Sequence, residues 1–74
     1  MKLATARRMK FWSIRELANR AGVSPRTVNT IELGTTTPSL ITIRKLCEAL
    51  EVDPLEIDEF RGIILGERAA LAHV

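Results

Sequence analysis

The stretch Ser13-Ile-Arg-Glu-Leu-Ala-Asn-Arg-Ala-Gly-Val-Ser-Pro-Arg-Thr-Val-Asn-Thr-Ile-Glu32 decides the fold of this 74-residue chain. Ser13, with Glu16 three residues later, matches the capping-box pattern that starts a helix. Gly22 suits the left-handed conformation that ends one. Ser24-Pro25 then indicates a cap followed by a first-turn proline. The stretch therefore predicts two short helices joined by a tight glycine turn.

The second of these helices has two different faces. Successive helical residues are rotated by about 100°, which places Val28 and Ile31 on one side and Arg26, Asn29 and Thr30 on the other. The first side is apolar and suits a core. The second is short, polar and rich in hydrogen-bonding groups, so it is the face that we expect to be offered to a ligand.

Helical patterns continue on both sides of the central stretch. A mixed face of apolar and basic residues at helical spacing predicts a helix over the first dozen residues, and an apolar stripe predicts another over residues 40–50. Asp53-Pro54 and Glu56 repeat the pattern of cap, first-turn proline and acid, which predicts a fifth helix from Pro54. No segment has a convincing strand pattern. The fold class is all-α, a compact five-helix domain.

The C-terminal part has a less definite pattern. We assign residues 1–61 to the domain and residues 62–74 to a C-terminal extension that could continue as a helix. Four residues in the last 18 positions of the chain, on both sides of this boundary, form one apolar stripe: Ile57, Phe60, Ile64 and Leu71. Such a stripe is too large to leave in water on a small domain. It either packs back on the monomer or joins a second chain, and we favour a homodimer contact.

Composition indicates a globular protein, with 46% apolar and 27% charged residues. No apolar run approaches the roughly 20 residues that a membrane helix needs, and the first residues lack the apolar region of a signal peptide. We therefore expect a cytoplasmic protein with no membrane partner. Cys47 is the single cysteine, which excludes an intrachain disulfide. Its helical spacing predicts a small buried hydrophobe.

The modest net charge of +2 conceals an uneven distribution. Residues 1–34 contain seven basic and two acidic residues, a net charge of +5, and residues 35–74 contain four basic and seven acidic residues, a net charge of −3. A basic half on a small protein suits binding to a polyanion. An ordinary solvated surface explains the charge equally well.

No catalytic constellation is apparent. The one histidine is His73, tyrosine is absent, and no His or Cys pair has metal-ligand spacing. We therefore do not expect an enzyme, and we expect no cofactor and no metal.

Part of the chain resembles the Cro and phage-repressor type of helix-turn-helix domain, also called the xenobiotic-response-element type. The residues that carry this resemblance are Glu16-Leu17-Ala18, Gly22-Val23-Ser24, Val28, Ile31-Glu32, Gly34, Pro38, Thr42, Leu46 and Ala49-Leu50. The match spans about residues 3 to 57 and implies a lambda-repressor-like fold. A shorter stretch from Glu16 to Val28 is also similar to the mercury-resistance-type winged helix family. That family would continue into strands, whereas this chain continues into an amphipathic helix.

The resemblance assigns roles to particular positions. It implies that Pro25, Arg26, Asn29 and Thr30 face base edges of double-stranded DNA. The phosphate-contacting positions that it implies are Ser13, Arg15, Ser24, Thr27, Thr35, Thr36 and Thr37. Arg7 and Glu32 match a pair that is commonly a buried ion pair in this family. Two positions depart from the pattern, because Phe11 and Glu51 stand where small residues or glycine are frequent.

Two functions of different classes remain open at this stage. The first is a sequence-specific, homodimeric transcriptional regulator, with repression favoured over activation, that places the helix at about residues 24–33 in the major groove. The second is an antitoxin or a subunit of a larger complex, whose C-terminal segment binds another protein.

Overall fold

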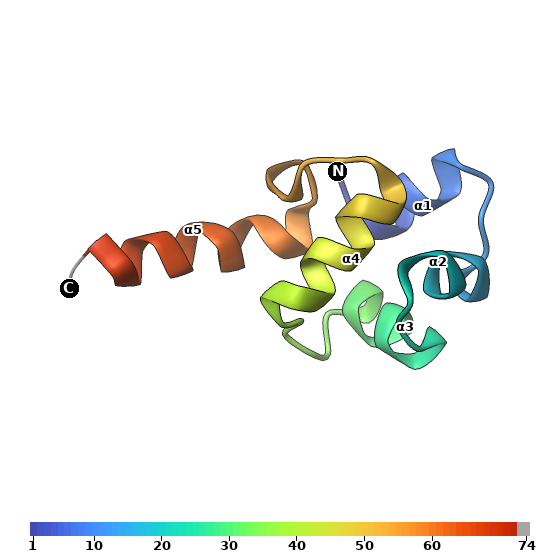
Figure 1. Ribbon diagram of the computed structural model, residues 1–74, viewed down its shortest axis with the longest axis horizontal. Coiled ribbons are helices and arrows are strands. Elements are labelled where there is room, and N and C mark those ends of the chain that lie inside the picture. The colour runs from blue at the N-terminus through green and yellow to red at the C-terminus, as the bar shows by residue number, and fades with distance from the viewer. Residues whose placement is uncertain (73–74) are drawn as a thin grey trace.

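Serine caps start three of the helices in the computed structural model, which describes residues 1–72 and the side chains of residues 1–66. Its elements are α1 (Leu3–Met9), α2 (Ile14–Ala21), α3 (Pro25–Leu33), α4 (Leu40–Leu50), the 3-10 turn η1 (Pro54–Glu56) and α5 (Asp58–Ala72). The described residues contain no strand (Figure 1). The predicted all-α class is confirmed.

The caps have the geometry that the sequence indicates. The Oγ atoms of Ser13, Ser24 and Ser39 accept the amide three residues later, at 3.0, 3.1 and 3.2 Å. The sequence predicts a complete capping box at Ser13, and the part of this prediction that concerns the Glu16 side chain is wrong. The Glu16 carboxylate accepts from Arg20 Nε at 3.0 Å instead, since the arginine one turn later offers it an ion pair.

A glycine turn sets the angle between α2 and α3. Gly22 has a φ of 72°, in the left-handed region, and the following amide, of Val23, donates to Ala18 O at 3.0 Å. Ala18 is fully buried, and its small side chain lets the neighbouring helices come close. Helix α2 packs against both α3 and α4, so the turn unit and the fourth helix share one core.

The core takes side chains from all five helices. Its largest fully buried members are Phe60, Leu3, Leu17, Ile31, Ile43, Leu46, Leu50, Ile57 and Val28. Two of these, Ile57 and Phe60, correct the predicted dimer stripe, because they pack inside the monomer and have no surface left for a second chain. The stripe's Ile64 is half-buried, and the surroundings of Leu71 lie outside the described side chains.

The fifth helix also differs from its prediction. Pro54 starts only the short turn η1, which holds a complete capping box between Asp53 and Glu56, and α5 begins at Asp58. The predicted domain limit at residue 61 falls inside α5, which continues without a break. The beginning of α5 belongs to the folded unit, since Glu59 Oε1 accepts the amide of Leu3 at 2.9 Å. None of the described helices is long and apolar enough to span a bilayer.

Cys47 is buried, as its spacing predicts. Loss of solvent, together with the charge of Asp53, raises the pKa of the thiol to about 11. The thiol is therefore neutral at physiological pH and acts as a small apolar side chain.

Among the side chains that the structure describes, the ion pair between α1 and α3 is the most buried. Arg7 is only 8% exposed. Its Nε and Nη2 donate to the two carboxylate oxygens of Glu32, at 2.7 and 3.0 Å, and its Nη1 donates to Trp12 O at 2.9 Å. The hydrogen-bonded carboxylate raises the pKa of Arg7. One guanidinium thus joins α1, α3 and the connection between α1 and α2.

Replacing Glu32 by Gln should destabilise the domain strongly, because the Arg7 charge would stay buried without its counter-charge. We expect the free energy of unfolding to fall by about 3 kcal/mol, measured by urea denaturation. The matched control is Glu48→Gln, which removes an exposed carboxylate 3.7 Å from Arg44 and should change stability by less than about 0.5 kcal/mol. Equal effects of the two substitutions would contradict the structural role of the buried pair.

Within residues 1–72, two residues other than glycine have a positive φ, Phe11 at 61° and Glu51 at 57°. Both depart from the small residues expected by resemblance, and the left-handed backbone gives the reason for that expectation. The Phe11 side chain is 96% exposed, so it recovers no packing energy in the monomer. Glu51 ends α4 in the position that favours glycine.

Substitution of Glu51 by Gly should therefore stabilise the protein. The left-handed conformation costs a residue with a Cβ about 1–2 kcal/mol, and part of this is offset by the greater freedom of glycine in the unfolded chain. We expect a gain of about 1 kcal/mol in the free energy of unfolding. Glu51→Ala is the control, since it also removes the exposed 3.8 Å contact with Lys10 but keeps the backbone strain. A gain of the same size for alanine would show that strain is not the cause.

Candidate nucleic-acid interface

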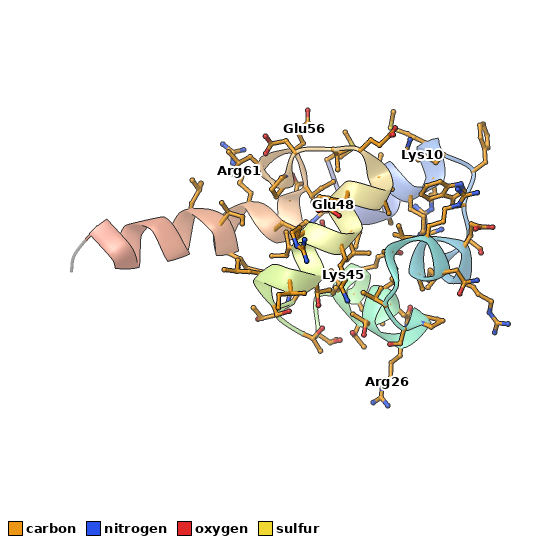
Figure 2. All side chains as sticks on the ribbon, viewed as in Figure 1. Lys10, Arg26, Lys45, Glu48, Glu56 and Arg61 are labelled. Atoms are coloured by element: carbon orange, nitrogen blue, oxygen red, sulfur yellow. The ribbon has the colours of Figure 1, made fainter. Side chains whose placement is uncertain are left out.

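Helix α3 is held by one face and exposed on the other. Val28 and Ile31 are fully buried, whereas Arg26 and Asn29 on the opposite side are exposed. In Figure 2 the Arg26 side chain points away from the body of the domain. Pro25 is exposed at the first position of the helix. Three of the four residues predicted to read bases thus lie at the free end and the free side of a firmly anchored helix.

Arg26 and Asn29 have hydrogen-bonding groups available for a ligand. Among the described residues, neither side chain takes part in a hydrogen bond or an ion pair. An arginine can bind guanine O6 and N7 with two bonds, and an asparagine can bind adenine N6 and N7 in the same way. The free face of α3 can therefore make the two contacts that distinguish bases most sharply.

Thr30 is in a different situation. It is half-buried, its Oγ1 donates to Thr27 O at 3.2 Å, and the same oxygen accepts from Thr36 Oγ1 at 3.1 Å. Its hydroxyl proton is thus used within the protein. A base contact through this hydroxyl would first require breaking a bond inside the domain, which leaves the methyl group as the part suited to a thymine methyl.

Thr30 also connects α3 to the threonine loop, which consists of Thr35, Thr36 and Thr37. Thr35 donates to Thr30 O twice, from its amide at 3.0 Å and from its Oγ1 at 3.2 Å. With the bond from Thr36, three hydrogen bonds connect the loop to Thr30. Within the described part of the chain, no side-chain hydrogen bond engages Thr37. Sequence reasoning missed this linkage, because the spacing of threonines does not reveal which hydroxyl meets which.

The start of α2 and the start of α3 provide the remaining predicted phosphate contacts. Ser13 and Arg15 are exposed at the first turn of α2. Ser24 Oγ and Thr27 Oγ1 lie 2.8 Å apart and share one proton, so only one of these two hydroxyls can still donate outward. Helix N-termini and exposed arginines suit anions. These groups can bind phosphates, with fewer free hydroxyl donors than the sequence suggests.

Internal pairing reduces the positive charge that is free for a ligand. In the basic half, Arg7, Lys10 and Arg20 have carboxylate partners within 4 Å. Arg20 also lies over the Trp12 ring, with 4.4 Å to its centroid. On α4, the exposed Lys45 has no ion-pair partner among the described residues (Figure 2). In the sequence it counts only as one of the four basic residues among residues 35–74.

The geometry described above has a counterpart in one known protein family. A family model described as helix-turn-helix matches residues 3–57, from the first residue of α1 to the residue after η1. The match covers most of the 74 residues and supports the resemblance to the Cro and phage-repressor type. No curated protein and no solved structure matches the chain.

Replacing Thr36 by Val should loosen the loop from α3. Valine has the shape of threonine but lacks the hydroxyl that bonds to Thr30. A lost hydrogen bond of about 1 kcal/mol corresponds to roughly fivefold faster opening. We therefore expect the Thr35 amide to exchange its hydrogen about fivefold faster, measured by nuclear magnetic resonance. Thr37→Val is the control, and the linkage would be refuted by equal exchange rates in the two variants.

Proposed function

The chain belongs to the helix-turn-helix family, and on that premise we propose that it is a sequence-specific transcriptional regulator that binds double-stranded DNA as a homodimer. The family match supports DNA binding. Sequence-specific reading is supported by two exposed, unengaged side chains, Arg26 and Asn29, on a helix whose other face is buried.

In the proposed complex, α3 lies in the major groove. Arg26 binds a guanine and Asn29 an adenine, and Pro25 at the helix start packs beside them. Thr30 contributes its methyl group and holds the threonine loop. The start of α2, with Ser13 and Arg15, binds the phosphate backbone, which positions the domain without reading sequence.

Two copies would read two half-sites. Helix-turn-helix dimers bind half-sites that are centred about 34 Å apart, which is one turn of DNA. Repression is the regulatory outcome that requires the fewest additional contacts, because a protein bound at an operator excludes other proteins from that DNA. In this proposal the chemistry is recognition, and no catalytic step is involved.

The two arginines of the interface give the test. Arg26→Ala should weaken binding to the preferred operator by about 1–3 kcal/mol, with little change on random DNA, because a base contact is lost. Arg15→Ala should weaken binding to all sequences and reduce the salt slope by about one, because a phosphate contact is lost. The preferred operator is first selected from a random oligonucleotide pool, and affinities are then measured by fluorescence anisotropy at several salt concentrations.

The comparison of the two variants decides the assignment. If Arg26→Ala loses affinity equally on operator and random DNA, Arg26 does not read a base. If the pool yields no enriched sequence with the wild-type protein, the proposed specificity itself is wrong.

A further inference from the structure

Three threonine hydroxyls at the end of α3 all direct their protons into the protein. Thr30 Oγ1 donates to Thr27 O at 3.2 Å, and Thr35 Oγ1 donates to Thr30 O at 3.2 Å. A carbonyl oxygen has no proton to donate, so these two directions are fixed. The single hydroxyl proton of Thr30 is then already in use. Thr36 must therefore be the donor in the 3.1 Å contact between Thr36 Oγ1 and Thr30 Oγ1.

The outward side of the Thr36 hydroxyl thus presents an acceptor. Thr36 is exposed, and a hydroxyl oxygen has two lone pairs beside its one proton. The phosphate oxygens of DNA are acceptors as well. A phosphate contact by Thr36, as the resemblance implies, would require breaking its bond to Thr30. The group that fits the hydroxyl as it stands is a hydrogen-bond donor.

Thr37 is in the opposite situation within the same loop. Its side chain is exposed and takes part in no hydrogen bond with any residue that the structure describes. Its proton is available to a phosphate without loss of an internal bond. The threonine loop can therefore bind the DNA backbone through Thr37 and leave the Thr36 hydroxyl for another contact.

The Thr36 hydroxyl lies beside the free face of α3. Its partner Thr30 directly follows the exposed Asn29, and Thr30 lies about one helical turn, roughly 6 Å, beyond Arg26. The hydrogen bond keeps Thr36 Oγ1 within 3.1 Å of Thr30 Oγ1. The loop thus adds one acceptor group to the end of the face that carries Arg26 and Asn29.

Two groups in the major groove can donate to such an acceptor, the N4 amine of cytosine and the N6 amine of adenine. Guanine and thymine present acceptors there. We propose that Thr36 reads one base of the operator by accepting a hydrogen bond from an exocyclic amine. Thr30 is the positioning residue, because it takes the Thr36 proton and so fixes the direction of the hydroxyl. This inference rests on the proposed DNA binding and names a further specificity-determining residue for it.

Removal of single amines from the selected operator tests the contact. Purine in place of adenine, or 2-pyrimidinone in place of cytosine, deletes the amine alone, and affinities are measured by fluorescence anisotropy. At one position beside those read by Arg26 and Asn29, the wild type should lose about fivefold in affinity, the value of one hydrogen bond. Thr36→Val should lose less than about twofold from the same removal, since it has no acceptor to lose. The altered base pairing affects both proteins equally and cancels in the comparison.

Two matched variants separate reading by Thr36 from a general effect on the loop. Thr36→Ser keeps the hydroxyl, and Thr37→Val removes a different hydroxyl of the same loop. Both should keep the fivefold loss on removal of the amine, to within about twofold. Circular dichroism verifies that each variant is folded.

The positioning role is tested by Thr30→Val, which removes the acceptor of the Thr36 proton. The freed hydroxyl can then donate as well as accept. Guanine or thymine at the position read by Thr36 should therefore bind within about twofold of adenine or cytosine. The preference for guanine opposite Arg26 should remain. A variant that only loosens the loop would lower the affinity for all four bases by the same factor, and that result would overturn the role of Thr30.

The remaining outcomes separate this inference from the proposed function. If every amine removal weakens the wild type and Thr36→Val by equal factors, Thr36 reads no base. Equal loss of affinity by Thr36→Val on operator and random DNA would indicate a phosphate contact and would also overturn the inference. In both cases sequence-specific binding stands if Arg26→Ala loses affinity selectively for the operator. If the wild type enriches no sequence, the proposed function fails, and the reading by Thr36 fails with it.

Discussion

The buried pair of Arg7 and Glu32 is the contact on which the rest of the structure depends. A charge in a domain this small is tolerated only when its partner and its remaining donors are satisfied, and here the carboxylate and Trp12 O satisfy them. Because Glu32 lies near the end of α3, the pair also fixes how this helix leaves the core. Any surface that α3 offers to DNA is therefore positioned from α1.

Local patterns predicted most of the fold. Serine caps, Gly22 and the apolar stripes marked the helices to within a few residues, because each signal depends only on neighbours along the chain. The stripe of Ile57 and Phe60 was misassigned for a physical reason. The same helical spacing describes a face turned toward the protein's own core and one turned toward a second chain, and the distinction depends on where α4 lies.

The two faces of α3 were predictable to a similar depth. Helical spacing separated Arg26 and Asn29 from Val28 and Ile31, and the structure places them on opposite sides of α3 as expected. The spacing could not reveal that the Thr30 hydroxyl already bonds to Thr27 and Thr36. Such bonds depend on the path of a loop, which follows from tertiary packing and not from periodicity. Hydroxyl groups near a predicted interface therefore need their protons counted before they are assigned to a ligand.

The division of α3 into an anchored and a free side has an evolutionary consequence. Val28 and Ile31 are constrained by the core, so they can change only together with their neighbours. Arg26 and Asn29 carry no such constraint, and substitutions there cost the fold little. In the proposed mode of DNA binding, a lineage of such proteins would acquire a new operator through single substitutions at these two positions, while every intermediate remains folded and exposed to selection.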